Sequence, residues 1–218
     1  MHRLEVKKLI LGNFMVNCYI VYTSNSKDAI IIDPGADPLQ ILDFINRKEL
    51  NVKYIINTHG HYDHIGANNE IKSVLNSTIY IHKLDEKMLS SSTKNLSLFL
   101  GKLYKTKADG FVEEGDEFKI DNKVFKILHT PGHTPGSMSI MVDDSLFCGD
   151  LVFKDGIGRT DLFGGSSRDL ALSIKNKILI LNDDVKLYPG HGPETTVKYI
   201  KENNYMVDYI LKSEKLNF

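Results

Sequence analysis

The sequence lacks most of the features that mark a secreted or membrane-bound protein. Among its 218 residues are two cysteines, Cys18 and Cys148, each inside an apolar segment, which indicates two buried, reduced thiols rather than a disulfide framework. No stretch approaches the roughly 18 to 20 consecutive apolar residues that a membrane span needs. Glu5 falls where a signal peptide would begin its apolar run. We therefore expect a cytoplasmic protein with no membrane partner.

The sequence also lacks an excess of charge of either sign. Its 27 lysines and arginines are balanced by 28 aspartates and glutamates, which gives a net charge of −1. Such a balance provides no field that would attract nucleic acid, so we expect a small-molecule substrate. There is no repeat, low-complexity tract or linker, and 42% hydrophobic content is enough for one large core. We expect a single domain, residues 1–218, that is a monomer or a small homo-oligomer.

Strand-like and helical patterns follow one another in two similar halves. In the first half we expect strands at residues 4–11, 18–23, 29–33, 52–57 and 78–82, and helices at residues 38–47 and 65–75. Residues 84–103 are less regular and only partly helical in pattern. In the second half we expect strands at residues 118–120, 124–129, 137–142, 145–148 and 185–188, and helices at residues 168–181 and from 194 onward. This order suits two sheets packed face to face with helices outside, although periodicity alone leaves other α/β arrangements open.

Five of the eight histidines stand beside Gly, Asp or another His in segments that follow strands: His59, His61, His64, His133 and His191. In an extended loop, the side chains of His59, His61 and Asp63 alternate so that they point the same way, while His64 turns toward a neighbouring point. These four side chains therefore suit two adjacent metal positions. Imidazole and carboxylate ligands suit zinc, iron or manganese, and no cysteine is near enough in sequence for a structural thiolate site. We expect an open, catalytic metal centre.

Three later segments have the same construction, an apolar strand that runs into a glycine-flanked ligand. They lead to His133, Asp150 and His191. Each glycine permits a bend and a close approach of the backbone. Gathered at one edge of the sheets, the seven side chains would divide between two metals, with Asp150 as the bridge, but spacing only suggests this division.

The run Thr58-His59-Gly60-His61-Tyr62-Asp63-His64 resembles the signature of the metallo-β-lactamase superfamily. The segments around His133, Asp150 and His191 match the family's later motifs in order and approximate spacing, so the resemblance spans about residues 4–200. It implies a four-layer αββα sandwich of two mixed β-sheets flanked by helices, with the site at one edge. It also supplies the ligand sets: His59, His61 and His133 for one metal, Asp63, His64 and His191 for the other, and Asp150 between them.

Within the superfamily, residues 189–196 and the run Gly158-Arg159-Thr160-Asp161 resemble the short bacterial glyoxalase II-like hydrolases. The resemblance implies a hydroxyacylglutathione hydrolase-like thioesterase that cleaves a small thioester or ester with a metal-bridging hydroxide. Two divalent metal ions per chain are expected, zinc or alternatively iron or manganese. Asp63 and Asp150 are the expected catalytic residues. Full-length glyoxalase II has a further C-terminal helical domain that grips glutathione, and this chain ends soon after its last ligand, so recognition of glutathione stays open.

Three further residues are candidates for supporting roles. Arg159 and Phe163, in the loop that follows Asp150, are candidates for contacts with the substrate, although Arg159 and Asp161 also fit a charged turn with an internal ion pair. Asp33 resembles the family's aspartate behind the ligands, which would orient a ligand imidazole. Asp-Pro-Gly is also an ordinary turn sequence, so both interpretations of Asp33 stand.

Other functions are compatible with the same motifs. The Gly-Arg-Thr-Asp run is shared with persulfide dioxygenases, which use a single iron held by two His and one Asp. A lactonase of the same superfamily would hydrolyse a different bond. A metal-binding module without catalysis is disfavoured because Asp63 and Asp150 are both in place. A nuclease is disfavoured by the charge balance and by the lack of a large inserted domain.

Overall fold

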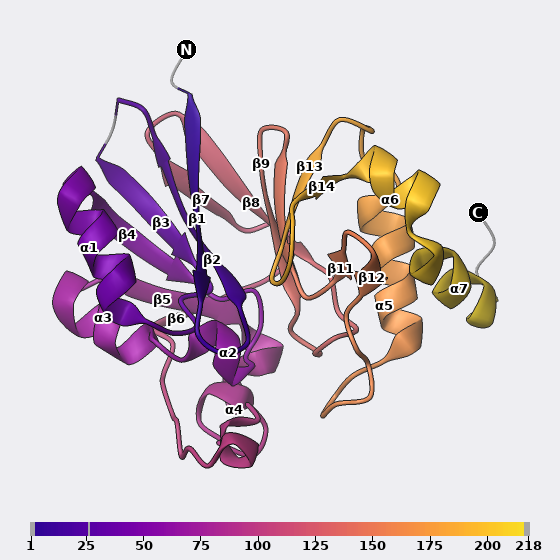
Figure 1. Ribbon diagram of the computed structural model, residues 1–218, viewed down its shortest axis with the longest axis horizontal. Coiled ribbons are helices and arrows are strands. Elements are labelled where there is room, and N and C mark those ends of the chain that lie inside the picture. The colour runs from indigo at the N-terminus through magenta and orange to yellow at the C-terminus, as the bar shows by residue number, and fades with distance from the viewer. Residues whose placement is uncertain (1–2, 26, 216–218) are drawn as a thin grey trace.

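The computed structural model describes residues 3–25 and 27–215. Two β-sheets pack face to face, with helices on their outer sides (Figure 1). The first half of the chain forms one sheet with its helices, and the second half forms the other. This is the predicted four-layer αββα sandwich of two mixed sheets. Within the described residues, no helix has the length and apolar character to cross a membrane.

The first sheet contains six strands that lie in the order of the sequence. They are β1 (Leu4–Leu11), β2 (Val16–Thr23), β3 (Asp28–Ile32), β4 (Asn51–Ile56), β5 (Thr78–His82) and β6 (Gly110–Val112). β1, β2 and β3 pair antiparallel, whereas β3 to β6 pair parallel. The parallel pairs need crossover connections, and these contain α1 (Pro38–Lys48) and α3 (Asn68–Leu75).

The second sheet also contains six strands, in the order β14, β13, β10, β9, β8, β7. Their bounds are β7 (Glu117–Ile120), β8 (Lys123–His129), β9 (Met138–Val142), β10 (Ser145–Gly149), β13 (Lys186–Pro189) and β14 (Thr195–Thr196). Only β10 and β13 pair parallel. Tight turns join β7 to β8 and β9 to β10, with Asp121 and Asp143 in the left-handed conformation at φ values of 53° and 49°. A small hairpin follows β10 and consists of β11 (Val152–Phe153) and β12 (Gly156–Ile157).

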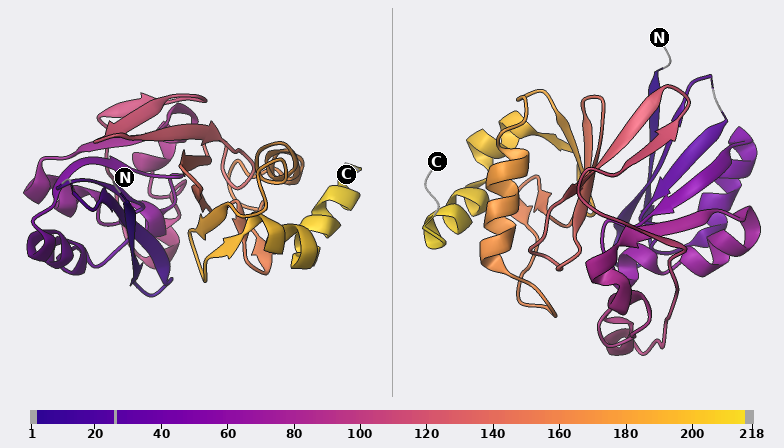
Figure 2. Two further views of the ribbon diagram at one scale, coloured as in Figure 1. Left: turned by 90° about the horizontal axis from the view of Figure 1, so that it is seen from above. Right: turned by 180° about the vertical axis from the view of Figure 1, so that it is seen from behind.

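Alternation along the strands distributes the apolar residues between three layers of core. In β2, Cys18 and Ile20 face the helices of the first half, whereas Tyr19 and Val21 face the second sheet. A third cluster fills the space between the second sheet and the C-terminal helices, and it contains Cys148. The two groups of helices therefore lie at opposite sides of the molecule (Figure 2). Both cysteines are buried and free, as predicted.

Several helices differ from the sequence prediction. The helix expected at residues 65–75 is divided into α2 (Tyr62–Ile65) and α3, because the backbone N–H of Ala67 donates to the carbonyl of Pro34 between them, 2.9 Å away. His64 therefore lies inside α2 rather than at the start of a longer helix. The irregular segment after β5 forms three short helices. These are η1 (Lys83–Asp85), α4 (Glu86–Leu89) and η2 (Ser97–Leu100).

The C-terminal helices are also shorter than predicted. The helix expected at residues 168–181 is α5 (Ser167–Ser173), which widens into the π-helical turn η3 (Ile174–Ile178). The helix expected from residue 194 begins only after β14, where the hydroxyl of Thr196 accepts a hydrogen bond from the N–H of Tyr199. It is then divided into α6 (Val197–Asn203) and α7 (Tyr205–Ser213). Asn204 separates them, and its side chain accepts hydrogen bonds from the first turn of α7.

Candidate metal centre

The seven predicted ligands all follow strands and meet at one edge of the sandwich. β4 leads to His59 and His61, and α2 carries Asp63 and His64. The second sheet contributes the other three, which follow β8, β10 and β13: His133, Asp150 and His191.

Parallel pairing of β10 with β13 places Asp150 beside the loop of His191. The N–H of Gly190 donates to the carbonyl of Gly149 across 2.8 Å. A Cβ at residue 190 would lie 2.6 Å from Cε1 of His64, so only glycine allows this close approach. The short loop thus brings His191 to the ligands of the first sheet.

Three groups of donor atoms lie close enough to hold metal ions, each with its atoms within 4.8 Å of one another. One group, here called the first cluster, consists of His59, His61 and His133. Another, the second cluster, consists of Asp63, His64 and His191. The third contains Asp150 with one histidine from each cluster, His59 and His64. The first and second clusters contain the same residues as the two ligand sets that the sequence resemblance implied.

Distances within the site place Asp150 between the clusters. Oδ2 of Asp150 lies 3.6 Å from Nε2 of His133 in the first cluster and 3.7 Å from Nε2 of His191 in the second. Its Oδ1 lies 3.4 Å from Nε2 of His64. Inside the clusters, Nδ1 of His61 lies 2.9 Å from Nε2 of His133, and Oδ2 of Asp63 lies 3.2 Å from Nε2 of His191.

The donor atoms themselves indicate that a cation belongs here. Nε2 of His59, Nε2 of His64 and Oδ1 of Asp150 are buried and have no hydrogen-bond partner among residues 3–25 and 27–215. Each unsatisfied buried polar group costs about 1–3 kcal/mol, so several in one place point to a missing partner. A metal ion accepts such lone pairs, and a set of imidazole and carboxylate donors suits zinc, iron or manganese. The residues present therefore fit two metal ions.

The first cluster is buried, and two of its imidazoles are poorly protonated. Burial lowers the pKa of His59 well below its ordinary value, and His64 and His133 lower it further. Burial, together with the neighbouring His133, lowers the pKa of His61 to about 3. Both imidazoles are therefore unprotonated at neutral pH, which is the form that binds a metal ion.

The second cluster combines imidazoles with a carboxylate, and Asp150 lies beside it. Burial alone would lower the pKa of His64, but Asp150 and Asp63 reverse the effect and raise it well above its ordinary value. Burial likewise opposes protonation of His191, whereas its hydrogen bond to Asp63 raises its pKa overall. Burial would raise the pKa values of Asp63 and Asp150, but the neighbouring histidines, His64 and His191 among them, together outweigh it and lower both. Both carboxylates are therefore ionised and attract cations.

Asp33 lies directly behind the ligands. Its Oδ2 is 2.9 Å from Nδ1 of His64, and its two oxygens accept hydrogen bonds from the N–H and the hydroxyl of Thr58 at 2.7 and 2.6 Å. This is the contact that a role in orienting His64 requires. Asp33 also has a left-handed backbone conformation, with φ at 53°.

Asp85 is a supporting residue that the sequence analysis missed. It is completely buried and accepts three hydrogen bonds from two different ligand loops. The N–H of Gly60, between His59 and His61, donates to Oδ2 at 3.0 Å. From the loop of His133, the hydroxyl of Thr134 and the N–H of Gly136 donate at 2.7 Å each. Asp85 follows β5 in the irregular segment, where no pattern in the sequence distinguishes it from a solvent-exposed helix residue.

The two candidates for substrate contact have different positions. Arg159 lines the hollow above the metal centre, but its guanidinium forms two 2.8 Å hydrogen bonds with Asp161, and its backbone carbonyl lies 2.7 Å from Nδ1 of His133. Phe163 is 53% exposed and does not line this hollow, and Nζ of Lys94 lies 4.8 Å from the centre of its ring. The residue of this loop that joins Arg159 in lining the hollow is Leu162 instead.

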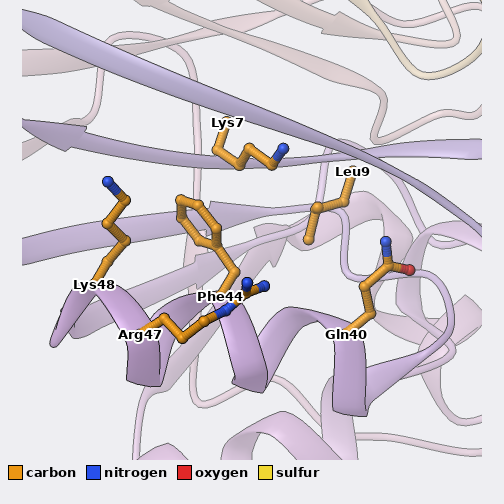
Figure 3. Close-up of a pocket in the computed structure, with 6 residues that line it drawn as sticks. All are labelled: Lys7, Leu9, Gln40, Phe44, Arg47 and Lys48. Carbon is orange, nitrogen blue, oxygen red and sulfur yellow. The ribbon is translucent and has the colours of Figure 1, made fainter.

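The hollow above the metal centre has a volume of about 610 Å³ and includes five of the seven ligands: His61, Asp63, His133, Asp150 and His191. Another hollow, of about 400 Å³, lies between β1 and α1 (Figure 3). It is lined by Lys7, Leu9, Gln40, Phe44, Arg47 and Lys48. None of these is a His, Cys, Asp or Glu. The hollow with the metal donors is therefore the candidate active site.

Comparisons with known proteins agree with this geometry. The family model described as the metallo-beta-lactamase superfamily matches residues 11–191. The hydroxyacylglutathione hydrolase GloC of Haemophilus influenzae is 36% identical over 202 residues, which is 88% of this chain and 92% of GloC.

Two solved structures are also similar. BLEG-1, described as a B3 metallo-beta-lactamase, has a TM-score of 0.88 and 35% identity, covering 93% of this chain and 99% of BLEG-1. TTHA1623, solved in a di-iron-bound form, has a TM-score of 0.79 and 31% identity, covering 91% and 98% of the two chains. Together with the histidine-rich site, these findings show that the chain belongs to the metallo-β-lactamase superfamily, as a metal-dependent hydrolase.

Proposed function

We propose that this protein is a dinuclear thioesterase that hydrolyses a small thioester to an acid and a thiol. The observation that carries the proposal is the pair of three-donor clusters that share Asp150 at the floor of an open hollow. The similarity to GloC, whose name describes hydrolysis of a hydroxyacyl thioester of glutathione, supports the choice of bond. The balanced charge of the chain supports a small substrate rather than a nucleic acid.

The residues divide the work of such a reaction between them. His59, His61 and His133 would hold one metal, Asp63, His64 and His191 the other, and Asp150 both. Bound metals of this kind supply a water of lowered pKa and a Lewis acid for the carbonyl. Asp150 contributes a carboxylate whose pKa is held low by His64 against the effect of burial, so it stays an anionic ligand.

The position of Asp63 suits a residue that takes part in proton transfer. Its side chain is 24% exposed, and it lies at the hollow where substrate and water enter. Its carboxylate is hydrogen-bonded to His191. We infer that Asp63 orients the attacking water and accepts its proton, which then leaves with the thiol. Arg159, at the wall beside His133, contacts the polar part of the substrate.

The identity of the metals belongs to the proposal as well. Histidine and aspartate donors suit zinc, and they suit iron equally. TTHA1623 contains two irons. We propose zinc as the metal of this chain, with iron or manganese as alternatives that elemental analysis distinguishes.

A second candidate function is hydrolysis of a cyclic amide or ester, and the similarity to BLEG-1 favours it. The same donors and the same water would serve for a β-lactam or a lactone. A persulfide dioxygenase is the third candidate, and it requires a single iron. The complete second cluster supports two metals instead.

A substrate screen with two detectors tests the proposal. One assay measures the release of free thiol from lactoylglutathione and from simple thioesters. A parallel assay measures oxygen uptake with glutathione persulfide as substrate. We expect thiol release without consumption of oxygen. Oxygen uptake with the persulfide and no thiol release would replace the proposal with the dioxygenase, and turnover of lactams or lactones alone would replace it with the second candidate.

A further inference from the structure

One wall of the hollow above the metal centre is apolar. It is formed by Leu96 and, from η2, by Phe99 and Leu100, and Phe14 faces the same hollow from the turn between β1 and β2. These side chains are not part of the core, since Phe99 is 75% exposed and Phe14 50% exposed. When a ligand covers large apolar groups in a concave site, the burial of their surface contributes favourable free energy to binding.

The wall is held in place by a buried residue next to the ligands. The side chain of Asn95 donates to the carbonyl of Tyr104 at 3.1 Å and accepts from the N–H of Ser97 at 3.0 Å. The backbone carbonyl of Asn95 accepts from the N–H of Tyr62 at 2.8 Å, and Tyr62 lies between His61 and Asp63. The apolar wall is therefore fixed relative to both clusters.

The backbone of the wall is strained at the residue that lines the hollow. Leu96 has a φ of 69°, a left-handed conformation that a leucine adopts at a cost of about 1–3 kcal/mol. Such strain persists where surrounding contacts impose it, and it is concentrated at functional sites. Leu96 lies between the buried Asn95 and the first residue of η2, and it lines the hollow.

A more polar hollow of about 550 Å³ adjoins the first one. The two hollows share four lining residues: Phe14, Tyr62, Asp63 and Leu100. They therefore lie side by side, and both are lined by the candidate metal ligand Asp63. Polar and charged side chains line the second hollow: Asn13, Asp37, Glu70 and Lys102. The site therefore offers an apolar hollow and a more polar hollow, and Asp63 lines both.

We infer that the substrate is a thioester with an apolar acyl group, which packs against Leu96, Phe99 and Leu100. Thiol carriers in cells are polar chains, so the acyl group is the part that matches the apolar wall, and the carrier matches the polar hollow. The inference rests on the proposed thioesterase function. In the reaction, the C–S bond breaks, water adds its oxygen to the carbonyl carbon, and its proton leaves with the thiolate, so no oxidant or reductant is needed.

A series of acyl groups on one small neutral carrier tests the inference. Acetyl, butanoyl and hexanoyl thioesters of N-acetylcysteamine differ only in apolar length. We expect kcat/KM of the metal-loaded protein to rise at least about tenfold from acetyl to hexanoyl. Phe99→Ala should lower the hexanoyl-to-acetyl ratio about fivefold to tenfold.

Leu98 supplies the matched control. It lies beside Phe99 in η2 and is 45% exposed, but it does not line either hollow. Leu98→Ala removes a similar exposed apolar side chain from the same short helix, and it should leave the hexanoyl-to-acetyl ratio unchanged. An equal loss in Leu98→Ala and Phe99→Ala, or a flat acyl series, would overturn the inference while the thioesterase function stands.

Binding of the product acids separates this inference from the proposed function. Hexanoate and acetate are titrated calorimetrically into the metal-loaded protein and into Phe99→Ala. Preference for hexanoate that Phe99→Ala abolishes would support the apolar site even if every thioester were inert, in which case only the proposed function fails. Equal affinity for the two acids would overturn the apolar site.

Discussion

The two clusters of the metal centre use the same kinds of residues but differ in exposure and charge. The first cluster consists of three imidazoles that are at most 3% exposed. The second contains a carboxylate, and the side chains of Asp63 and His191 are 24% and 28% exposed. The difference indicates a division of labour, in which the enclosed cluster of imidazoles would hold its metal firmly, whereas the more open cluster with its carboxylate would meet water and substrate.

Different residues support the two clusters from behind. Asp85 fastens the loops of the first cluster to each other, whereas Asp33 contacts His64 of the second cluster. Both supports are buried carboxylates from the first half of the chain. If the division of labour is correct, removing each support should affect one cluster more than the other.

The largest effect is expected where the two clusters meet. Asp150→Ala removes the carboxylate that faces both clusters. We expect kcat/KM for a thioester to fall by at least about 10³-fold, which is more than the loss of a single charge-stabilising group usually causes. Metal content per chain should fall as well, as elemental analysis would measure. Asp155→Ala is the control, because this carboxylate is outside the site and bonds only to the hydroxyl of Tyr199 among the hydrogen bonds described. Retention of both metals and of turnover by Asp150→Ala would rule out its bridging role.

Removal of Asp85 should weaken the first cluster selectively. Asp85→Ala leaves Gly60, Thr134 and Gly136 without their acceptor, and such losses behind a ligand reduce metal affinity about 10- to 100-fold. Competition with a chromophoric chelator measures the two affinities in turn. Asp85→Asn keeps the shape and part of the acceptor capacity, so its effect should be smaller. Selective loss of the second metal would contradict the assignment.

Replacement of Asp33 should have the opposite selectivity. In Asp33→Asn the group facing Nδ1 of His64 is no longer a carboxylate, and we expect roughly tenfold weaker binding of the second metal. The chelator competition used for Asp85 provides the comparison. Asp33 also accepts hydrogen bonds from Thr58, which precedes His59. Thermal unfolding of the metal-free variant should therefore be measured together with the chelator competition. If the affinity for the second metal is unchanged in Asp33→Asn, Asp33 does not act by orienting His64.

The smallest effect is expected at the rim of the hollow. Arg159→Ala removes a guanidinium that is largely exposed and already paired with Asp161, while the backbone carbonyl beside His133 is kept. We expect KM to rise about twofold to fivefold with little change in kcat, since exposed ionic contacts contribute under about 1 kcal/mol. Steady-state kinetics with charged and neutral carriers separate the two parameters. A large fall in kcat would give Arg159 a role in the reaction itself.

The sequence predicts the ligands better than it predicts their surroundings. Residues such as His133 and His191 stand out because each is an imidazole that follows a strand and is flanked by glycine, and strand ends converge at an edge of the sheet. Asp85 and Leu96 do not stand out, because their roles arise from contacts between segments that are distant in sequence. The irregular segment between β5 and β6 has no period that indicates its three short helices, yet it supplies both the support of the first cluster and the apolar wall.

Elemental analysis of protein purified without added metal, combined with thioester hydrolysis, tests the central claim most directly. The account predicts close to two metal ions per chain and release of thiol that declines as a chelator removes the more exposed second metal. One metal ion per chain with undiminished hydrolysis would contradict it.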